Sequence, residues 1–374
     1  MTPLVRQSAD SRGLFFSIIF SAILALMSEL ALYRKYRPSG FAQVVGQESI
    51  VQVLEGSIKQ GAVAHAYLFA GSRGTGKTSI ARILAHELGT SKHDLYEIDA
   101  ASSRGIDEIR ELREAVQTLP FESKYKVYIV DEAHMLTKEA FNALLKTLEE
   151  PPRHVIFILA TTEVHKLPET IISRCQTFTF RKPGLDELRT VITRAAKQEG
   201  RKLEPAATDL IALLGDGSYR DALGVLQQTF GATADKLITA ELVASVSGAP
   251  AYNIVTKFID GLVGQNIEQS LGAIRQTSER HRDPRVFLKL VMRTVRYAMF
   301  LKFAPTVGRE LSAPLGETER KFVEDLAGRK ESVSLSLVLR ELLVTYDELG
   351  HSYIPELPLE LAVLRINGLL AKHV

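Results

Sequence analysis

The stretch GSRGTGKT, residues 71–78, has the residue types and spacing of a loop that holds phosphate groups. The buried-strand candidate AYLFA precedes it and apolar residues at helical spacing follow it, which is the context that such a loop requires. Its glycines let backbone N–H groups turn toward phosphate oxygens, and the start of the helix adds partial positive charge. The alternative is a glycine-rich turn without a ligand. The complete pattern instead predicts a nucleotide site formed by Gly71, Ser72, Arg73, Gly74, Thr75, Gly76, Lys77, Thr78 and Ser79.

Four residues have predicted roles toward bound ATP. We expect the Lys77 ammonium to reach the β- and γ-phosphates and the Thr78 hydroxyl to ligate Mg²⁺. The segment VYIVDEAH places Asp131 and Glu132 at the carboxyl end of another predicted strand. We predict that Asp131 binds Mg²⁺, directly or through water, and that Glu132 activates the attacking water as a general base. The alternative is a pair of acids that begin a helix, where the helix dipole favours negative charge.

Two more polar residues are candidates for contacts near the γ-phosphate. The predicted strand over residues 155–160 ends in Thr161 and Thr162, and we assign Thr162 to a sensor position beside the phosphate and the water. Arg220, in the stretch GSYRDAL, lies on a predicted helix from which it can reach back to the phosphates. The alternatives are an ordinary strand threonine and a solvated helix arginine.

Short apolar runs and amphipathic helical stretches alternate from Tyr67 onward, and this alternation predicts the elements that position the site. Strands alternating with helices indicate a mostly parallel sheet that is covered on both faces. The predicted helices include one that ends at Gly89, the charged stretch DEIRELREAVQTL, and FNALLKTLEE, which Pro151 and Pro152 terminate. The predicted strands are AYLFA, LYEID, KVYIV, HVIFILAT and QTFTF.

Only helical periodicity follows the stretch RKPG, residues 181–184. A short helical block extends to about Ser247, and a longer one follows. In the longer block, Asp283 and Pro284 have the residue types of a helix cap and a first helical turn.

Composition limits the class of protein further. The chain has 374 residues, enough for two or three domains, and a net charge of +2 that neither requires nor excludes a nucleic-acid partner. Its single cysteine, Cys175, rules out an intrachain disulfide, and we expect it to be a small buried filler.

Residues 1–26 differ from the rest of the chain. Their apolar run LFFSIIFSAILAL is shorter than the roughly 20 residues of a membrane-spanning helix, and MSELALYRKYRP reads as a fresh protein start at Met27. We favour a mis-assigned start or a dispensable tail; a signal or anchor and a docked helix are the alternatives. We therefore expect no membrane partner and a cytoplasmic location.

Together these motifs resemble the AAA+ ATPases of the clamp-loader group, and within it the gamma/tau family of bacterial DNA polymerase III. The resemblance implies an α/β AAA+ P-loop domain over residues 27–183, with helices on both faces of a parallel sheet. A small helical lid over residues 184–246 and an all-α collar for oligomerisation over residues 247–374 follow. The matching stretches are ALYRKYRPSGFAQVVGQ, GSRGTGKTSIAR, EIDAASSRGIDEIREL, VYIVDEAHMLTKEAFNALLKTLEEPP, FILATTEVHKLPETIISRCQTF, GSYRDAL and, near the end, IPELPLELAVLRI.

The resemblance implies an ATPase that uses ATP and Mg²⁺ and drives a clamp loader of the polymerase holoenzyme, without a polymerase site of its own. Its implied partners are copies of itself, related clamp-loader subunits, the sliding clamp and primer-template DNA. Arg174, in the Ser-Arg-Cys motif, is implied to act in trans on ATP bound by the neighbouring subunit. Arg104 and Arg110 are implied to contact DNA phosphates; the alternative is solvation or pairing with nearby acids.

Two departures from the family pattern matter. No cysteine lies between the helix after residues 71–78 and the next strand, where the family commonly carries a cysteine zinc module, so we predict no zinc and a surface role for His86 and His93. The long family form also carries a C-terminal extension that binds the polymerase and helicase; because this sequence ends before one, we do not expect those contacts here.

Three other functions are the alternatives to an ATP-hydrolysing clamp-loader subunit. Intact Lys77, Asp131 and Glu132 argue against a non-hydrolysing structural clamp-loader subunit. The stretches EEPP and ALYRKYRP favour the bacterial branch over a replication-factor small subunit. The Ser-Arg-Cys motif and the collar-like tail disfavour a branch-migration motor.

Overall fold

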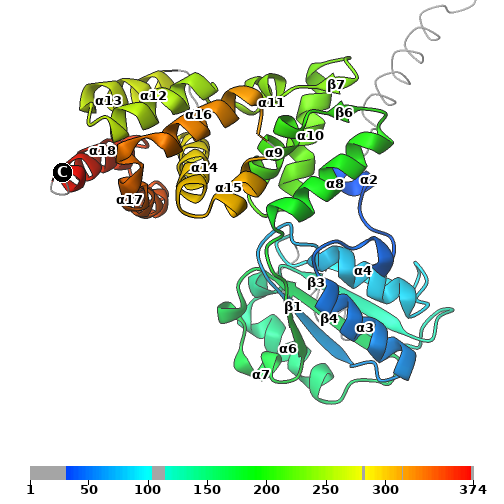
Figure 1. Cartoon of the computed structure of the whole chain (residues 1–374). Helices are drawn as coiled ribbons and strands as arrows, with labels where there is room; N and C mark the ends of the chain where they lie inside the picture. The colour runs from blue at the N-terminus through cyan, green and yellow to red at the C-terminus, as the bar shows by residue number, and fades with distance from the viewer. Residues whose placement is uncertain (1–30, 103–113, 280–282, 314, 372–374) are drawn as a thin grey trace, which may run out of the picture.

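The computed structural model describes residues 31–102, 114–279, 283–313 and 315–371. The chain forms an α/β part around a five-stranded sheet and a second part built mainly of helices (Figure 1). The strand order is β2-β3-β4-β1-β5 and every pair is parallel, so the predicted parallel sheet is confirmed. The strands are β1 (Ala66–Ala70), β2 (Leu95–Asp99), β3 (Lys126–Asp131), β4 (Val155–Thr161) and β5 (Gln176–Thr179).

Alternate residues of the strands pack against helices on opposite faces of the sheet. Tyr67 and Phe69 of β1 share one buried cluster with Ile80, whereas Leu68 belongs to another with Leu144. Both faces are therefore covered, as the continuous apolar strands predict. One face carries α3 (Glu48–Gln60) and α4 (Lys77–Glu87); the other carries α6 (Lys138–Glu149) and α7 (Glu169–Ile172).

Helix ends in the α/β part lie where the sequence predicts them. Gly89 follows α4 with a φ of 74°, a left-handed conformation that glycine adopts without strain. The Thr137 side chain caps α6 by accepting a hydrogen bond from the Ala140 N–H, and α6 ends before Pro151. The helix predicted from DEIRELREAVQTL lies mainly outside the described residues.

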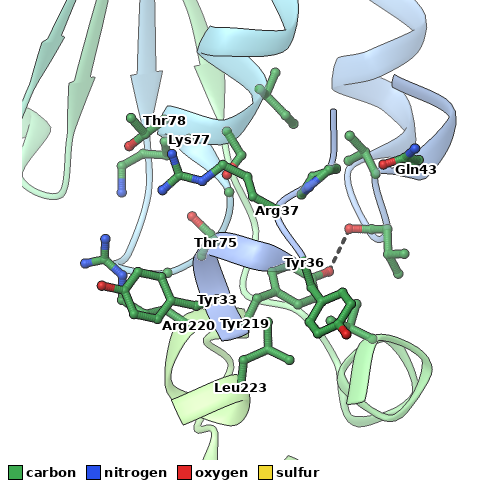
Figure 2. A pocket seen from close by; sticks show the side chains of 18 of the residues that line it. Tyr33, Tyr36, Arg37, Gln43, Thr75, Lys77, Thr78, Tyr219, Arg220 and Leu223 are labelled. Carbon is green, nitrogen blue, oxygen red and sulfur yellow. Dashed lines mark hydrogen bonds between the residues drawn. The ribbon is translucent and has the colours of Figure 1, made fainter. Parts of the chain in front are cut away.

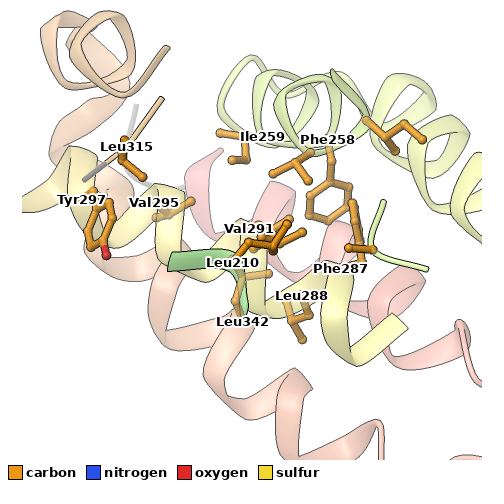
Figure 3. Packing of buried hydrophobic residues seen from close by; sticks show 14 of the residues in the cluster. Leu210, Phe258, Ile259, Phe287, Leu288, Val291, Val295, Tyr297, Leu315 and Leu342 are labelled. Atoms are coloured by element: carbon orange, nitrogen blue, oxygen red, sulfur yellow. The ribbon is translucent and has the colours of Figure 1, made fainter. Parts of the chain in front are cut away.

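The helical part has one continuous apolar core, which includes Phe258, Phe287 and Leu342 (Figure 3). Asp283 caps α14 by accepting a hydrogen bond from the Arg285 N–H at 2.8 Å, as predicted. The helices are α8 (Leu185–Gln198), α9 (Pro205–Leu214), α10 (Tyr219–Ala232), α11 (Ala240–Ser247), α12 (Tyr252–Val263), α13 (Ile267–Ser278), α14 (Pro284–Phe303), α15 (Pro305–Ser312), α16 (Glu317–Gly328), α17 (Leu335–Glu348) and α18 (Leu357–Leu370).

The expectation that only helices follow residue 184 is wrong. Two short strands, β6 (Lys202–Leu203) and β7 (Leu237–Ile238), pair in parallel between α8 and α11. Strands of this length are too short to produce a period-two pattern, and their pairing depends on segments that are distant in sequence.

The first described helix, α2 (Leu32–Lys35), packs on the helical part although it precedes the sheet in sequence (Figure 1). Leu32 belongs to the apolar core of the helical part, and its N–H donates to Gln227 Oε1 of α10 at 2.9 Å. The segment that follows α2 therefore links the two parts beside the carboxyl edge of the sheet.

Candidate active site

The strand order brings the predicted catalytic segments to one edge of the sheet. β4 lies between β3, which ends at Asp131, and β1, which precedes residues 71–78. Ala70 is paired with Thr161, and the Gly71 N–H donates to the Thr161 carbonyl at 3.1 Å. The carboxyl ends of parallel strands are the usual ligand-binding edge of such sheets.

The loop over residues 71–78 has the backbone of a phosphate cradle. Gly71, Gly74 and Gly76 have φ values of 150°, 76° and 103°, all in the region that favours glycine. The Lys77 ammonium donates to the carbonyls of Gly71 at 2.7 Å and Ser72 at 2.9 Å. Burial lowers the pKa of Lys77, while the carboxylates of Glu132 and Asp131 act to raise it. An ammonium in this position fits the phosphate oxygens of a nucleotide as further partners.

The residues at the loop fit a Mg²⁺–nucleotide complex. The Thr78 hydroxyl donates to Asp131 Oδ2 at 2.8 Å, so two oxygen donors of the kind that Mg²⁺ prefers already lie together. The buried Ser72 Oγ has no hydrogen-bond partner among the described residues. A buried hydroxyl without a partner is costly, and a ligand oxygen would satisfy it.

Glu132 has a backbone conformation that non-glycine residues rarely adopt. Its φ of 48° places it in the left-handed region, at a cost of about 1–3 kcal/mol that the surrounding structure must offset. The conformation turns the chain from β3 into the 3-10 turn η2 (Ala133–Met135). The Thr162 hydroxyl donates to Glu132 Oε2 at 3.2 Å, so the predicted sensor threonine contacts the predicted general base.

A cleft of about 920 Å³ is lined on one side by the loop over residues 71–78 and on the other by residues of the helical part (Figure 2). Asp131, Glu132 and Arg220 line it, together with loop residues from Arg73 to Ser79. Sequence reasoning missed its other wall, because those residues come from α2, the segment after it, α8 and α10. That wall includes Tyr33, Tyr36, Arg37, Val44, Val45, Val191, Arg194, Tyr219 and Leu223.

The amino-terminal end of α10 lies directly on the loop. The Tyr219 N–H donates to the Gly74 carbonyl at 3.0 Å, and the Tyr219 hydroxyl donates to the Val45 carbonyl at 2.6 Å. The next residue, Arg220, has its guanidinium carbon 5.1 Å from the centre of the Tyr33 ring, within the range of a cation–π contact (Figure 2). The predicted Arg220 is therefore at the cleft, held by an aromatic residue that the sequence did not single out.

Arg174 lies outside the cleft. It follows α7, and its guanidinium donates to Glu149 Oε1 at 2.7 Å and to the Thr170 carbonyl at 2.8 Å. The adjacent Cys175 packs against the apolar cluster under α6 and α7, and burial raises the pKa of its thiol to about 11. The thiol is protonated at neutral pH, in keeping with the predicted filler role.

Some predicted residues cannot be placed. Arg104 and Arg110 lie outside the described residues. His86 and His93 are exposed, as predicted. No group of three or more histidine, cysteine, aspartate or glutamate side chains with metal-binding geometry occurs within the described ranges. The absence of zinc stays a prediction.

Two family models match the chain. The model for the DNA polymerase III delta subunit matches residues 46–97 and 88–184, and the model for domain III of DNA polymerase III subunits gamma and tau matches residues 238–372.

Curated relatives match along most of the chain. It is 36% identical to DNA polymerase III subunit tau of Bacillus subtilis over 91% of its own length, and spans 63% of that relative. It is 34% identical to the tau subunit of Escherichia coli over 91% of its length, and spans 55% of it. DNA polymerase III subunit gamma of Buchnera aphidicola is 30% identical, with 92% of this chain and 98% of the relative covered.

Solved structures identify the fold. The Thermotoga maritima RuvB Holliday junction branch migration motor aligns with a TM-score of 0.50 at 23% identity, over 61% of this chain and 79% of that one. The chain thus has the AAA+ fold: a P-loop domain with a parallel sheet, followed by helical regions. Among the described residues, no helix has the length and apolar character needed to cross a membrane.

Proposed function

Because this chain belongs to the family of bacterial DNA polymerase III gamma and tau subunits, we propose that it is an ATP-hydrolysing motor subunit of a clamp loader. One observation carries the ATPase assignment: the Thr78–Asp131 hydrogen bond joins the phosphate loop to the acidic end of β3, with Glu132 next to it. A structural subunit without hydrolysis does not require this pair of oxygen donors together with a general base.

In the proposed reaction, the Lys77 ammonium exchanges the carbonyls of Gly71 and Ser72 for phosphate oxygens of ATP. Thr78 and Asp131 would hold Mg²⁺, which supplies charge neutralisation at the phosphates. Glu132 accepts a proton from the attacking water, and the Thr162 hydroxyl holds the Glu132 carboxylate in place.

Arg174 acts in trans in this proposal. Its place outside the cleft of its own chain supports an action on ATP bound by a neighbour. A guanidinium at the γ-phosphoryl group raises the rate of related reactions by about 10³–10⁵. At about 1.4 kcal/mol per decade, this amounts to about 4–7 kcal/mol of transition-state stabilisation.

The partners in this proposal are copies of this chain, related clamp-loader subunits, the sliding clamp and primer-template DNA. The lid over residues 184–246 would close on the nucleotide, and the collar over residues 247–374 would join the subunits. Arg104 and Arg110 would contact DNA phosphates without reading the bases. The protein would work in the cytoplasm, where its nucleotide and DNA are.

The decisive experiment measures ATP hydrolysis by the full chain in its assembly, with and without sliding clamp and primed DNA. A motor subunit hydrolyses ATP with Mg²⁺, and clamp and primed DNA together stimulate it. ATP binding without hydrolysis would favour the structural-subunit alternative. Hydrolysis stimulated by branched DNA but not by clamp would favour a branch-migration motor.

A further inference from the structure

His134 lies between the predicted general base and a second carboxylate. Its ring Nδ1 is 3.0 Å from Thr161 Oγ1 and 3.5 Å from Glu132 Oε2, and its Nε2 is 3.2 Å from Glu163 Oε2. The side chain of His134 is only 9% exposed. A buried imidazole therefore contacts the catalytic edge through one ring nitrogen and a structural carboxylate through the other.

Backbone geometry accounts for this placement. The left-handed conformation of Glu132 starts the 3-10 turn Ala133–Met135, which contains His134. The ring meets Thr161, the last residue of β4, and Glu163, which follows two residues later. The imidazole thus joins the carboxyl ends of β3 and β4.

The hydrogen-bonding needs of Thr161 and Glu163 indicate which ring nitrogen of His134 accepts and which donates. Thr161 Oγ1 already accepts the Glu163 N–H at 3.0 Å, so its own proton is free to be donated to His134 Nδ1. Glu163 is an ionised acceptor held by the Lys166 ammonium at 2.6 Å, so His134 Nε2–H donates to it. Lys166 lowers the pKa of Glu163, which keeps that carboxylate ionised.

Within the part of the chain that the structure describes, few side chains lie against the Glu132 carboxylate. Thr162 Oγ1 lies 3.2 Å from Glu132 Oε2, and His134 Nδ1 lies 3.5 Å from the same oxygen. The imidazole fills the space beside this oxygen and is itself fixed by Thr161 and Glu163. A carboxylate that must be aligned with a water molecule is sensitive to such a neighbour, since small misplacements lower rates strongly.

We propose that His134 is a positioning residue for the general base: its ring, fixed by Thr161 and Glu163, fills the space beside Glu132 Oε2 and so limits the orientations of the carboxylate that activates the attacking water. This inference rests on the proposed ATPase function and deepens it. His134 does not take the proton of the water itself; it fixes the carboxylate that does.

The test compares His134→Ala, His134→Asn and His134→Gln with the unmodified full chain in its assembly. We expect His134→Ala to lower kcat for ATP by about ten- to a hundredfold, with KM and ATP affinity changed less than about twofold. Asn places a polar group near the position of Nδ1, so His134→Asn restores most of the rate. Gln places its polar group near the position of Nε2, so His134→Gln restores less.

A double-variant cycle separates positioning from general loss of structure. On a Glu132→Gln background, followed by single-turnover hydrolysis, His134→Ala should cause little additional loss, because no carboxylate remains to be positioned. A further loss as large as that on the unmodified background would show that His134 acts independently of Glu132, and the proposal would be overturned. Equal or better rescue by Gln than by Asn would also overturn it.

His154→Ala is the matched control. The His154 ring contacts the carbonyls of Val116 at 3.2 Å and Thr118 at 3.1 Å, near the opposite end of β4. Removing it costs stability but leaves kcat unchanged, when rates are compared at a temperature where every variant is folded. Absence of ATP turnover by the unmodified assembly would overturn the proposed function and this inference together. Normal turnover in both the unmodified assembly and His134→Ala overturns the inference alone.

Discussion

At the scale of single residues, the buried carboxylate of Asp94 holds a chain segment in place through several hydrogen bonds. The carboxylate is fully buried just before β2, where it accepts N–H groups of Phe121 at 2.5 Å, Glu122 at 3.1 Å and Ser123 at 2.9 Å. Burial alone would raise the pKa of Asp94, but these amides outweigh it and lower the pKa well below the usual 3.8. The carboxylate therefore anchors the segment that leads into β3.

Asp94→Ala should destabilise the protein by about 2–4 kcal/mol, because three buried N–H groups lose their acceptor. Glu122→Ala is the control, since the exposed Glu122 uses only its backbone here. The contribution of ionised Asp94 to the free energy of unfolding is fully present above pH ~4. It is lost as the pH falls toward the lowered pKa that Asp94 has in the folded state. Urea unfolding at pH 7 and pH 3 measures it. Equal stability of variant and unmodified chain at pH 7 would refute the anchoring role.

At the scale of elements, the loop over residues 71–78 and helix α10 behave as one unit. A Cβ atom on Gly74 would lie 1.9 Å from Ser218 Oγ and 2.8 Å from Ser218 Cβ. The Gly74 carbonyl also accepts the Tyr219 N–H. No side chain therefore fits at position 74 while Ser218 keeps its place, and the Gly74–Tyr219 hydrogen bond ties the loop to the start of α10.

Gly74→Ala should lower stability without nucleotide by about 1–3 kcal/mol, through the clash and the strain of a left-handed alanine. Adding Ser218→Gly should restore part of this loss, because the clashing atoms are removed and glycine remains an acceptable helix cap. Gly224→Ala, in the interior of α10 with no atom in the way, is the control and should not destabilise. Thermal melts of the unmodified chain, Gly74→Ala, the Gly74→Ala/Ser218→Gly double variant and Gly224→Ala measure these stabilities. If Ser218→Gly restored nothing, backbone strain alone would account for the loss.

Local patterns predicted the elements that form the candidate site, because each depends on adjacent residues. The strands before Gly71 and Asp131, the cap at Asp283 and the phosphate loop follow from short-range sequence. The second wall of the cleft could not be predicted from short-range sequence patterns. Tyr33 and Tyr219 meet there only because α2 packs on α10, and no spacing rule connects segments so far apart in sequence. The pairing of β6 with β7 and the contact of Arg174 with Glu149 depend on the tertiary fold in the same way.

Across the whole molecule, the helical part connects the cleft beside residues 71–78 to the carboxyl-terminal helices. One apolar cluster extends from Leu188 in α8 to Leu370 in α18, and it also includes Leu32 of α2. The Lys289 ammonium of α14 contacts Asp216 Oδ1 at 2.8 Å, in the turn just before Ser218. Directly contacting residues therefore connect the loop over residues 71–78 to α14. The division between lid and collar stays a prediction, since this cluster runs through both.

Arg174→Ala tests the role of the neighbouring chain. ATP affinity of the isolated chain should be nearly unchanged, because Arg174 lies outside its own cleft. Hydrolysis in the assembly should fall by about 10³–10⁵, the usual contribution of such an arginine. Glu149→Gln, which removes the ion-pair partner of Arg174, is the matched variant and should preserve more activity. Weakened ATP binding by isolated Arg174→Ala chains would rule out the action in trans.

The most direct test of the ATPase assignment is a paired measurement of ATP binding and Mg²⁺-dependent hydrolysis on the unmodified assembly and on Glu132→Gln. The account predicts that Glu132→Gln binds ATP within about threefold of the unmodified protein and loses at least about a hundredfold in turnover, because only the general base is removed. Lys77→Ala, measured beside it, should lose ATP binding as well. Unchanged hydrolysis by Glu132→Gln, or equal loss of ATP binding in both variants, would contradict the account.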